Sequence, residues 1–190
     1  SIIKQEVGYE PQYPLSFPSL TVEETIGFAL KFKGYKGEAF SNKLSQIIET
    51  LNLGEVRKYY GYQLSPGLIK LQLLGVALAQ SESILVLDEP TSMIDIINKN
   101  HIWDILSASR ADKSLLIASH DMNEVKKLCD RVYLLVNGKV ITEGSPGHIA
   151  SLLKLPCKIS FSTSRSDQTE SLLAQKQIEY ALGDGIFNLT

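Results

Sequence analysis

The sequence predicts an α/β fold built on a mostly parallel sheet. Two short apolar runs carry this prediction, residues 84–87 and 115–118, because continuous apolar runs are typical of strands covered by helices on both faces. Around them lie stretches in which apolar residues repeat every three or four positions, as in amphipathic helices. The 190 residues are 44% apolar and 21% charged, an ordinary balance for a globular core. We therefore expect one α/β core with a small α+β appendage.

Composition narrows the possible functions. The net charge of −2 gives no general reason to propose a nucleic acid partner. Cys129 and Cys157 are far apart and lack the spacing of metal ligands or redox pairs, so we take both as small hydrophobic residues. No apolar run approaches the length that spans a membrane.

The first elements in chain order are a strand and a capped helix. Residues 6–12 predict a short strand that ends at Pro11. Thr21 and Glu24 have the spacing of a capping box, in which each side chain accepts a hydrogen bond from the other residue's backbone. The helix that they start is expected to run to about Phe32.

Two further helices are expected before the first apolar run. Ser41 is predicted to cap the second helix, with Gly54 near its end and an apolar face made of Leu44, Ile47, Ile48 and Leu51. The third helix, over about residues 68–79, is apolar nearly all round and is therefore expected to be buried.

After residue 90 the pattern alternates again. A turn over residues 91–95 leads into a helix that ends near residue 109, and a strand over 114–119 precedes a short helix over 123–129. Asn137-Gly138 predicts a hairpin, and Pro146 fits the first position of a helix. Residues 156–190 predict a small β-α-β appendage, which places the domain boundary between residues 155 and 156.

Two acidic residues follow the first apolar run. At the carboxyl end of a parallel strand, where α/β proteins place ligands, Asp88 can hold a Mg²⁺ ion bound to nucleotide phosphates. Glu89 can accept the proton of an attacking water, and Pro90 stops the strand. The alternative is a core strand that leaves into a polar turn.

A histidine follows the second apolar run. If the strands are parallel, His120 and Glu89 face one site, where an imidazole can donate hydrogen bonds to a γ-phosphate and to the attacking water. The alternative for a single histidine after a strand is an ordinary surface or core hydrogen bond.

The helix beginning after residue 65 can bind an anion at its N-terminus. Ser65 supplies a hydroxyl and Gly67 permits close approach to the backbone, although plain N-capping by Ser65 is equally compatible with the pattern. Asp95 either caps the next helix or contacts a partner subunit.

The order of these motifs resembles the nucleotide-binding domain of ABC (ATP-binding cassette) ATPases, over residues 3 to about 150. Residues 7–12 look like the Q-loop, 64–68 stand at the signature motif, 84–90 look like Walker B, 92–95 like the D-loop and 118–121 like the switch histidine. The resemblance implies a P-loop NTPase core with a helical subdomain over about residues 20–78.

The resemblance also implies the site and its partners. The substrate is ATP with Mg²⁺, Asp88 and Gln12 touch the metal, Glu89 is the general base and His120 contacts the γ-phosphate. Ser65, Gly67 and Asp95 of this chain would contact the nucleotide bound by the opposite subunit. The implied partners are a second ATPase subunit and a transmembrane permease, with no nucleic acid, and the implied location is cytoplasmic, peripheral at the inner face of the cell membrane.

Two features depart from the family pattern. Pro66 and Leu68 replace a glycine and a Gln or Met of the signature motif, and Leu71, beside Lys70, stands where a basic residue is usual. Pro66 removes a backbone N–H donor. The chain also contains no Gly-rich P-loop, so we expect a fragment that lacks the N-terminal part and is inactive alone.

Two other functions remain open. The altered signature motif is compatible with a non-hydrolysing half-site paired with a competent partner, although Glu89 and His120 argue for hydrolysis. A soluble ABC ATPase acting on ribosomes or DNA is the third hypothesis, but neither a second cassette nor a long coiled coil is seen in the sequence.

Overall fold

The structure is a computed structural model that describes residues 6–13, 15, 17–152, 159–176, 178, 180–183 and 186–189. It divides into two compact units, Ser1–Asp130 and Arg131–Thr190, which are described separately. The domain boundary predicted between residues 155 and 156 lies outside the described residues. None of the helices in the described part of the chain has the length and hydropathy needed to span a bilayer.

Three parallel strands form the sheet of the first unit, in the order β1 (Val7–Glu10), β2 (Ile84–Asp88) and β3 (Ser114–Ala118). Tyr9, Val86 and Leu116 lie opposite one another in this register. The parallel pairing predicted for the strands before Glu89 and His120 is therefore confirmed, and the carboxyl ends of all three strands meet at one edge.

The helical subdomain is inserted between β1 and β2. It contains α2 (Val22–Phe32), α3 (Gly37–Thr50), the short 3₁₀ helix η1 (Gly61–Gln63) and α4 (Pro66–Gln80). The predicted capping box of α2 is present, since the backbone N–H of Thr21 donates to Glu24 at 2.8 Å and the backbone N–H of Glu24 donates to the Thr21 hydroxyl at 3.2 Å.

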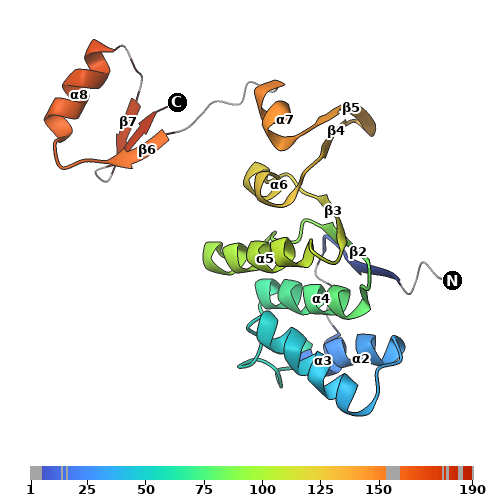
Figure 1. The fold of residues 1–190 in the computed structure, drawn as a ribbon. Helices are drawn as coiled ribbons and strands as arrows, with labels where there is room; N and C mark the ends of the chain where they lie inside the picture. Colours follow the sequence, from blue (N-terminus) through green and yellow to red (C-terminus); the bar gives the residue numbers. More distant parts are fainter. Residues whose placement is uncertain are drawn as a thin grey trace. The chain divides into compact units, whose positions relative to one another are not determined.

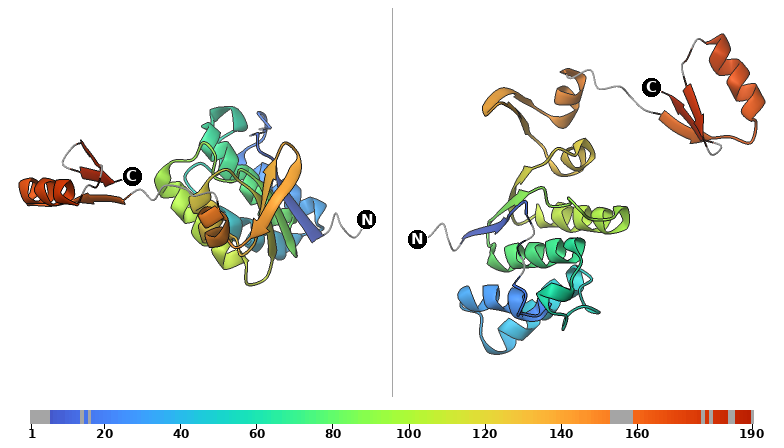
Figure 2. Two further views of the ribbon diagram at one scale, coloured as in Figure 1. Left: turned by 90° about the horizontal axis from the view of Figure 1, so that it is seen from above. Right: turned by 180° about the vertical axis from the view of Figure 1, so that it is seen from behind.

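Helix α4 lies at the centre of the first unit (Figure 1), between the α2–α3 pair and α5 (Ile96–Ser109). The same order of layers is seen from behind (Figure 2). A Cβ atom added to Gly8 of β1 would lie 2.0 Å from the Ala77 carbonyl of α4, so only glycine allows this close packing. Leu74, Leu85 and Ile102 belong to one core, which joins α4 to the sheet and to α5.

Helix α6 (Met122–Leu128) follows β3 and completes the first unit. The second unit begins with the predicted hairpin of β4 (Val132–Val136) and β5 (Lys139–Gly144), whose turn has φ values of 50° at Asn137 and 74° at Gly138. It continues with α7 (Pro146–Leu152), β6 (Ile159–Ser162), α8 (Ser166–Gln175), β7 (Tyr180–Gly183) and β8 (Ile186–Leu189). The last three strands form an antiparallel sheet in the order β6-β8-β7.

Two local predictions are wrong. Ser41 does not cap α3, because the helix begins at Gly37 and the Ser41 hydroxyl donates to the Gly37 carbonyl from inside it. Phe40 packs against the core and within 3.1 Å of the Cβ position of Gly27, so tertiary packing extends the helix beyond the side-chain cap.

The second correction concerns the sheet. Residues 84–87 were expected to be covered on both faces, but only Leu85 and Leu87 are fully buried. Tyr9, Ile84 and Leu116, on the opposite face, are 51%, 37% and 63% exposed. Within the described residues, helices cover one face of the sheet and the other face stays open.

Candidate functional site

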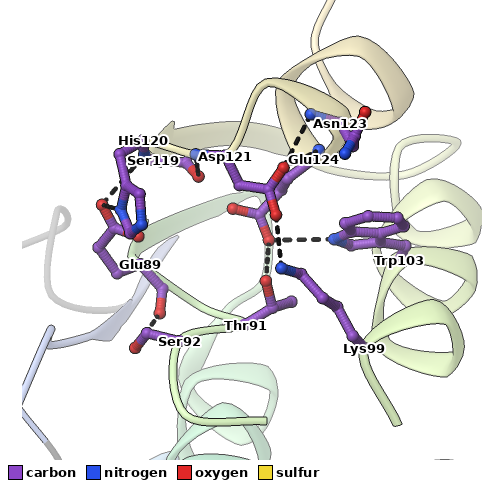
Figure 3. Close-up of polar contacts among 10 residues, drawn as sticks. All are labelled: Glu89, Thr91, Ser92, Lys99, Trp103, Ser119, His120, Asp121, Asn123 and Glu124. Carbon is purple, nitrogen blue, oxygen red and sulfur yellow. Dashed lines mark hydrogen bonds and ion pairs between the residues drawn. The ribbon is translucent and has the colours of Figure 1, made fainter. Parts of the chain in front are cut away.

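Polar side chains gather at the edge of the sheet where β2 and β3 end (Figure 3). Glu89 follows β2 directly, and Ser119 and His120 follow β3. Gln12 lies two residues beyond the end of β1 and is exposed. The fold therefore brings these residues to one edge, as expected for parallel strands.

Glu89 has an unusual backbone that is held on both sides. Its φ is 52°, in the left-handed region that few non-glycine residues adopt. Its N–H donates to the Ala118 carbonyl at 2.9 Å, and its own carbonyl accepts hydrogen bonds from the backbone N–H and the hydroxyl of Ser92 at 3.1 and 2.9 Å. This geometry aims the side chain across the end of β3, and such strain is typical of functional sites.

The carboxylate of Glu89 contacts His120. Its Oε1 lies 2.6 Å from Nδ1 of the imidazole and accepts the backbone N–H of His120 at 3.1 Å. The Glu89 side chain is 15% exposed, whereas that of His120 is 83% exposed. The hydrogen bond and the negative charge of Glu89 raise the pKa of His120 above its ordinary value. The pair thus joins a carboxylate at the end of β2 to an imidazole open to a ligand.

Asp88 and Gln12 could supply oxygen ligands to Mg²⁺. Asp88 is half-buried at the end of β2, and no donor in the described part of the chain hydrogen-bonds its carboxylate. No cluster of three or more His, Cys, Asp or Glu residues suited to a metal occurs among the described residues. Mg²⁺ bound to nucleotide takes one or two protein oxygens and completes its shell with phosphates and water. An unshared carboxylate at the end of β2 and an exposed amide beyond the end of β1 fit that requirement.

The helix termini carry the remaining predicted residues. The Ser65 hydroxyl accepts the backbone N–H of Leu68 at 3.3 Å, so Ser65 caps α4, and Pro66 occupies the first helical position. A Cβ atom on Gly67 would lie 3.2 Å from the Met93 carbonyl, which places this terminus against the turn that follows Glu89.

Asp95 caps α5. Its Oδ1 accepts the backbone N–H groups of Ile97 and Asn98, both at 3.1 Å. These hydrogen bonds lower the pKa of Asp95, with the Asn98 N–H contributing most. The capping alternatives for Ser65 and Asp95 are thus observed, and capping leaves both residues exposed at the surface.

A buried carboxyl near the site was not predicted from the sequence. Glu124 of α6 is 1% exposed, and its Oε1 accepts the Thr91 hydroxyl at 2.7 Å and the indole N–H of Trp103 at 3.1 Å (Figure 3). It therefore joins the turn after Glu89 to α5 and α6. The only sequence signal was an acidic residue on the otherwise apolar face of α6, beside Val125 and Leu128.

A buried ion pair was also missed. Lys70 of α4 and Glu10 of β1 are both 0% exposed, and the ammonium lies 3.2 Å from Oε1 of the carboxylate. The ammonium also donates hydrogen bonds to two backbone carbonyls, those of Pro11 and Asp88. Burial raises the pKa of Glu10 to about 7, against the opposing attraction of Lys70.

Comparison with known proteins relates the sequence to the ABC transporters. A family model described as ABC transporter matches residues 1–92. The chain is 33% identical over 143 residues to the phospholipid-transporting ATPase ABCA3 of Rattus norvegicus. The aligned region covers 75% of this chain and 8% of that protein. It is 30% identical over 163 residues to ATP-binding cassette sub-family A member 17 of Rattus norvegicus, covering 81% of this chain and 9% of that protein.

The fold has a clear counterpart among solved structures. A dimeric post-hydrolysis state of the ATP-binding cassette MJ0796 bound to ADP and Pi matches with a TM-score of 0.70 at 24% identity, over 76% of this chain and 65% of that chain. A second dimeric structure of MJ0796 gives a TM-score of 0.68.

The parallel sheet and the helical insertion before β2 give this chain the α/β fold of ATP-binding cassettes, which is a P-loop NTPase fold. The chain belongs to the ABC transporter ATPase family. It spans 8–9% of the length of the first two curated relatives named above.

Proposed function

We propose that the complete protein hydrolyses ATP at the interface of two such domains and couples this reaction to transport through a transmembrane partner. One observation carries the proposal. Glu89, directly after Asp88, contacts His120 at 2.6 Å where two parallel strands end. A carboxylate and an imidazole held together at this edge match the residues that position a nucleophilic water against a terminal phosphate.

The residues divide the chemical work. Glu89 accepts the proton of the attacking water. Nδ1 of His120 keeps Glu89 oriented, and the exposed edge of the imidazole faces the γ-phosphate. Asp88 and Gln12 hold Mg²⁺, which when bound supplies charge neutralisation at the phosphates. These roles fall to different carboxylates, because the Glu89 carboxylate, on a backbone with φ of 52°, contacts His120 after β3.

A second domain would complete the site. The N-terminus of α4, with Ser65 and Gly67 exposed or half-buried, can approach the γ-phosphate bound on a partner. Asp95 would contact the same interface. The dimeric form of the solved relatives named above supports this arrangement. The transmembrane partner is either a separate subunit or another part of a longer polypeptide, with this domain on the cytoplasmic side of the membrane.

A non-hydrolysing half-site is the second candidate. Pro66 occupies the first position of α4, where it withholds one N–H from a ligand at the helix end. In that case this domain would bind ATP, and a partner domain would hydrolyse it. The names of ABCA3 relatives favour a phospholipid as the transported molecule in either case.

Hydrolysis by the complete protein in lipid vesicles separates these candidates. Glu89→Gln should lower ATP turnover by roughly 10²–10⁴ while ATP binding survives, because the amide keeps the shape of the side chain but cannot accept the proton. Glu49→Gln, an exposed change on α3, is the matched control. Parental turnover in Glu89→Gln would exclude Glu89 as the base. Co-purification with ribosomes rather than a membrane protein would favour a non-transport ATPase.

A further inference from the structure

Lys70 is a fully buried lysine at the centre of the first unit. It belongs to α4, and its side chain is 0% exposed. A buried ammonium is costly unless hydrogen bonds and an opposite charge compensate for the lost water. Lys70 has both, since Nζ donates to the carbonyls of Pro11 and Asp88 at 3.0 and 3.2 Å and lies 3.2 Å from Glu10.

The two carbonyls stand at important positions. Pro11 directly precedes Gln12, and the second carbonyl is that of Asp88 itself. Gln12 and Asp88 are the two residues to which the proposed function assigns Mg²⁺. The Pro11 carbonyl belongs to the segment that follows β1, and the Asp88 carbonyl stands at the end of β2. A single nitrogen atom therefore holds both chain segments as they leave the sheet.

We propose that Lys70 is a positioning residue for the metal site, which fixes the segments carrying Gln12 and Asp88 at one separation. This inference rests on the proposed function. The backbone restraint acts just before the Gln12 side chain and at the Asp88 carbonyl, so it limits where both metal-binding groups can point. Because Lys70 also belongs to α4, the position of the helix that carries Ser65 and Gly67 is tied to the same site.

The contact with Glu10 has a different role. Of the two effects of Lys70 that lower the pKa of Glu10, Coulombic attraction is larger than the hydrogen bond from the ammonium, so Glu10 compensates Lys70 mainly through its charge. The ion pair and the two carbonyl contacts can therefore be removed separately. Glu10→Gln removes the charge and leaves both carbonyl contacts of Lys70. Lys70→Met removes the contacts but strands Glu10 in the interior.

A double variant avoids that buried charge. Replacing a buried ion pair by apolar residues of similar volume is often neutral for stability, whereas removing one partner is strongly destabilising. We call the two hydrogen bonds from Lys70 to the Pro11 and Asp88 carbonyls the clamp. The double variant of Lys70→Met with Glu10→Leu should therefore fold, and it lacks the clamp. Glu10→Gln is the comparison variant, because Lys70 keeps both carbonyl contacts and loses only the carboxylate charge. Since removal of one partner's charge is itself destabilising, thermal melting checks that Glu10→Gln is folded before its Mg²⁺ dependence is measured.

Two measurements test the proposal. In the complete protein, the Mg²⁺ concentration for half-maximal ATP hydrolysis should rise roughly 10–100-fold in the double variant, the usual effect of losing a group that orients metal ligands, and should stay near the parental value in Glu10→Gln. In the 190-residue chain, HNCO spectra should show the ¹³C resonances of the Pro11 and Asp88 carbonyls moving upfield in the double variant only.

The outcomes are distinct. Parental Mg²⁺ dependence in a folded double variant would overturn the proposal and leave Lys70 a structural residue. Unchanged carbonyl resonances would show that the clamp does not exist. If the parental protein does not hydrolyse ATP at all, the proposed function fails, and the carbonyl resonances alone then decide whether Lys70 holds the two segments.

Discussion

Oε1 of Glu89 lies 2.6 Å from Nδ1 of His120, although the two residues are 31 positions apart in the sequence. The contact depends on two backbone features. The φ of 52° at Glu89 turns its side chain toward β3, and the parallel pairing of Asp88 with Ala118 sets the end of β3 beside it. The carboxylate also accepts the His120 N–H, so the imidazole is held at its backbone as well as at its ring.

This contact predicts the titration of His120. Its pKa should lie above the ordinary value of 6.5, because the Glu89 hydrogen bond and charge favour the imidazolium. The resulting stabilisation is fully present below the unfolded pKa and is lost as pH rises through the folded pKa. NMR titration of the imidazole should give a lower pKa in Glu89→Gln than in the parental chain. An equal pKa in both would show that the pair does not form, and Glu49→Gln is the control.

The sequence predicted most of the fold for physical reasons. Continuous apolar runs, a capping box and an Asn-Gly hairpin are local signals, and each element they predict is present. The contact between Glu89 and His120 was also predictable, because parallel strands bring their carboxyl ends to one edge.

Contacts between distant polar residues were not predictable in the same way. Lys70 lies on a helix that is apolar nearly all round. No local pattern indicates that its ammonium contacts Glu10 and two backbone carbonyls, which are 18 to 60 positions away in the sequence. The Glu124 cluster likewise depends on how α5 and α6 pack. Burial of one sheet face only, rather than both, depends on which segments cover the sheet, and the pattern of residues 84–87 does not contain that information.

The signature segment gives a prediction about association. Restoring Pro66→Gly and Leu68→Gln should tighten ATP-driven dimerisation of the complete protein, because the first position of α4 regains an N–H at the end that would face a phosphate in the proposed dimer. Dimer formation in a Glu89→Gln background can be followed by gel filtration with ATP. Unchanged dimerisation would mean that the segment already binds as it stands or is never used. Thermal melting checks that the added glycine does not unfold α4.

The buried carboxyl of Glu124 gives a prediction about stability. Glu124→Ala should lower the free energy of unfolding by roughly 2–5 kcal/mol, because the Thr91 hydroxyl and the Trp103 N–H lose their acceptor. Glu124→Gln keeps an acceptor oxygen and should cost less. Urea unfolding followed by fluorescence suits this test, since Trp103 is the only tryptophan of the sequence. Glu49→Ala should stay within about 0.5 kcal/mol of the parental value, and a similar loss in both variants would contradict the role of Glu124.

The open face of the sheet predicts self-association of the 190-residue chain. Tyr9 and Leu116 flank Val86 across that face, and Ile84 lies two residues before Val86 on the same strand. Tyr9, Ile84 and Leu116 are 51%, 37% and 63% exposed. A contiguous apolar patch of this kind tends to be covered by another protein surface, and in a solution of the chain alone the available surface is a second copy. Light scattering should therefore report a mass above that of the monomer.

A charge on the patch should reverse this association. Leu116→Lys places an ammonium on the open face, in the edge strand β3, where burial against a second copy would require its desolvation. The average mass of this variant should fall toward that of the monomer at the same concentration. Leu172→Lys is the matched control, because Leu172 is also exposed, at 55%, but lies on α8 in the second unit. If the parental chain is monodisperse and monomeric, or if both lysine variants reduce the mass equally, the open face of the sheet is not the surface that drives association.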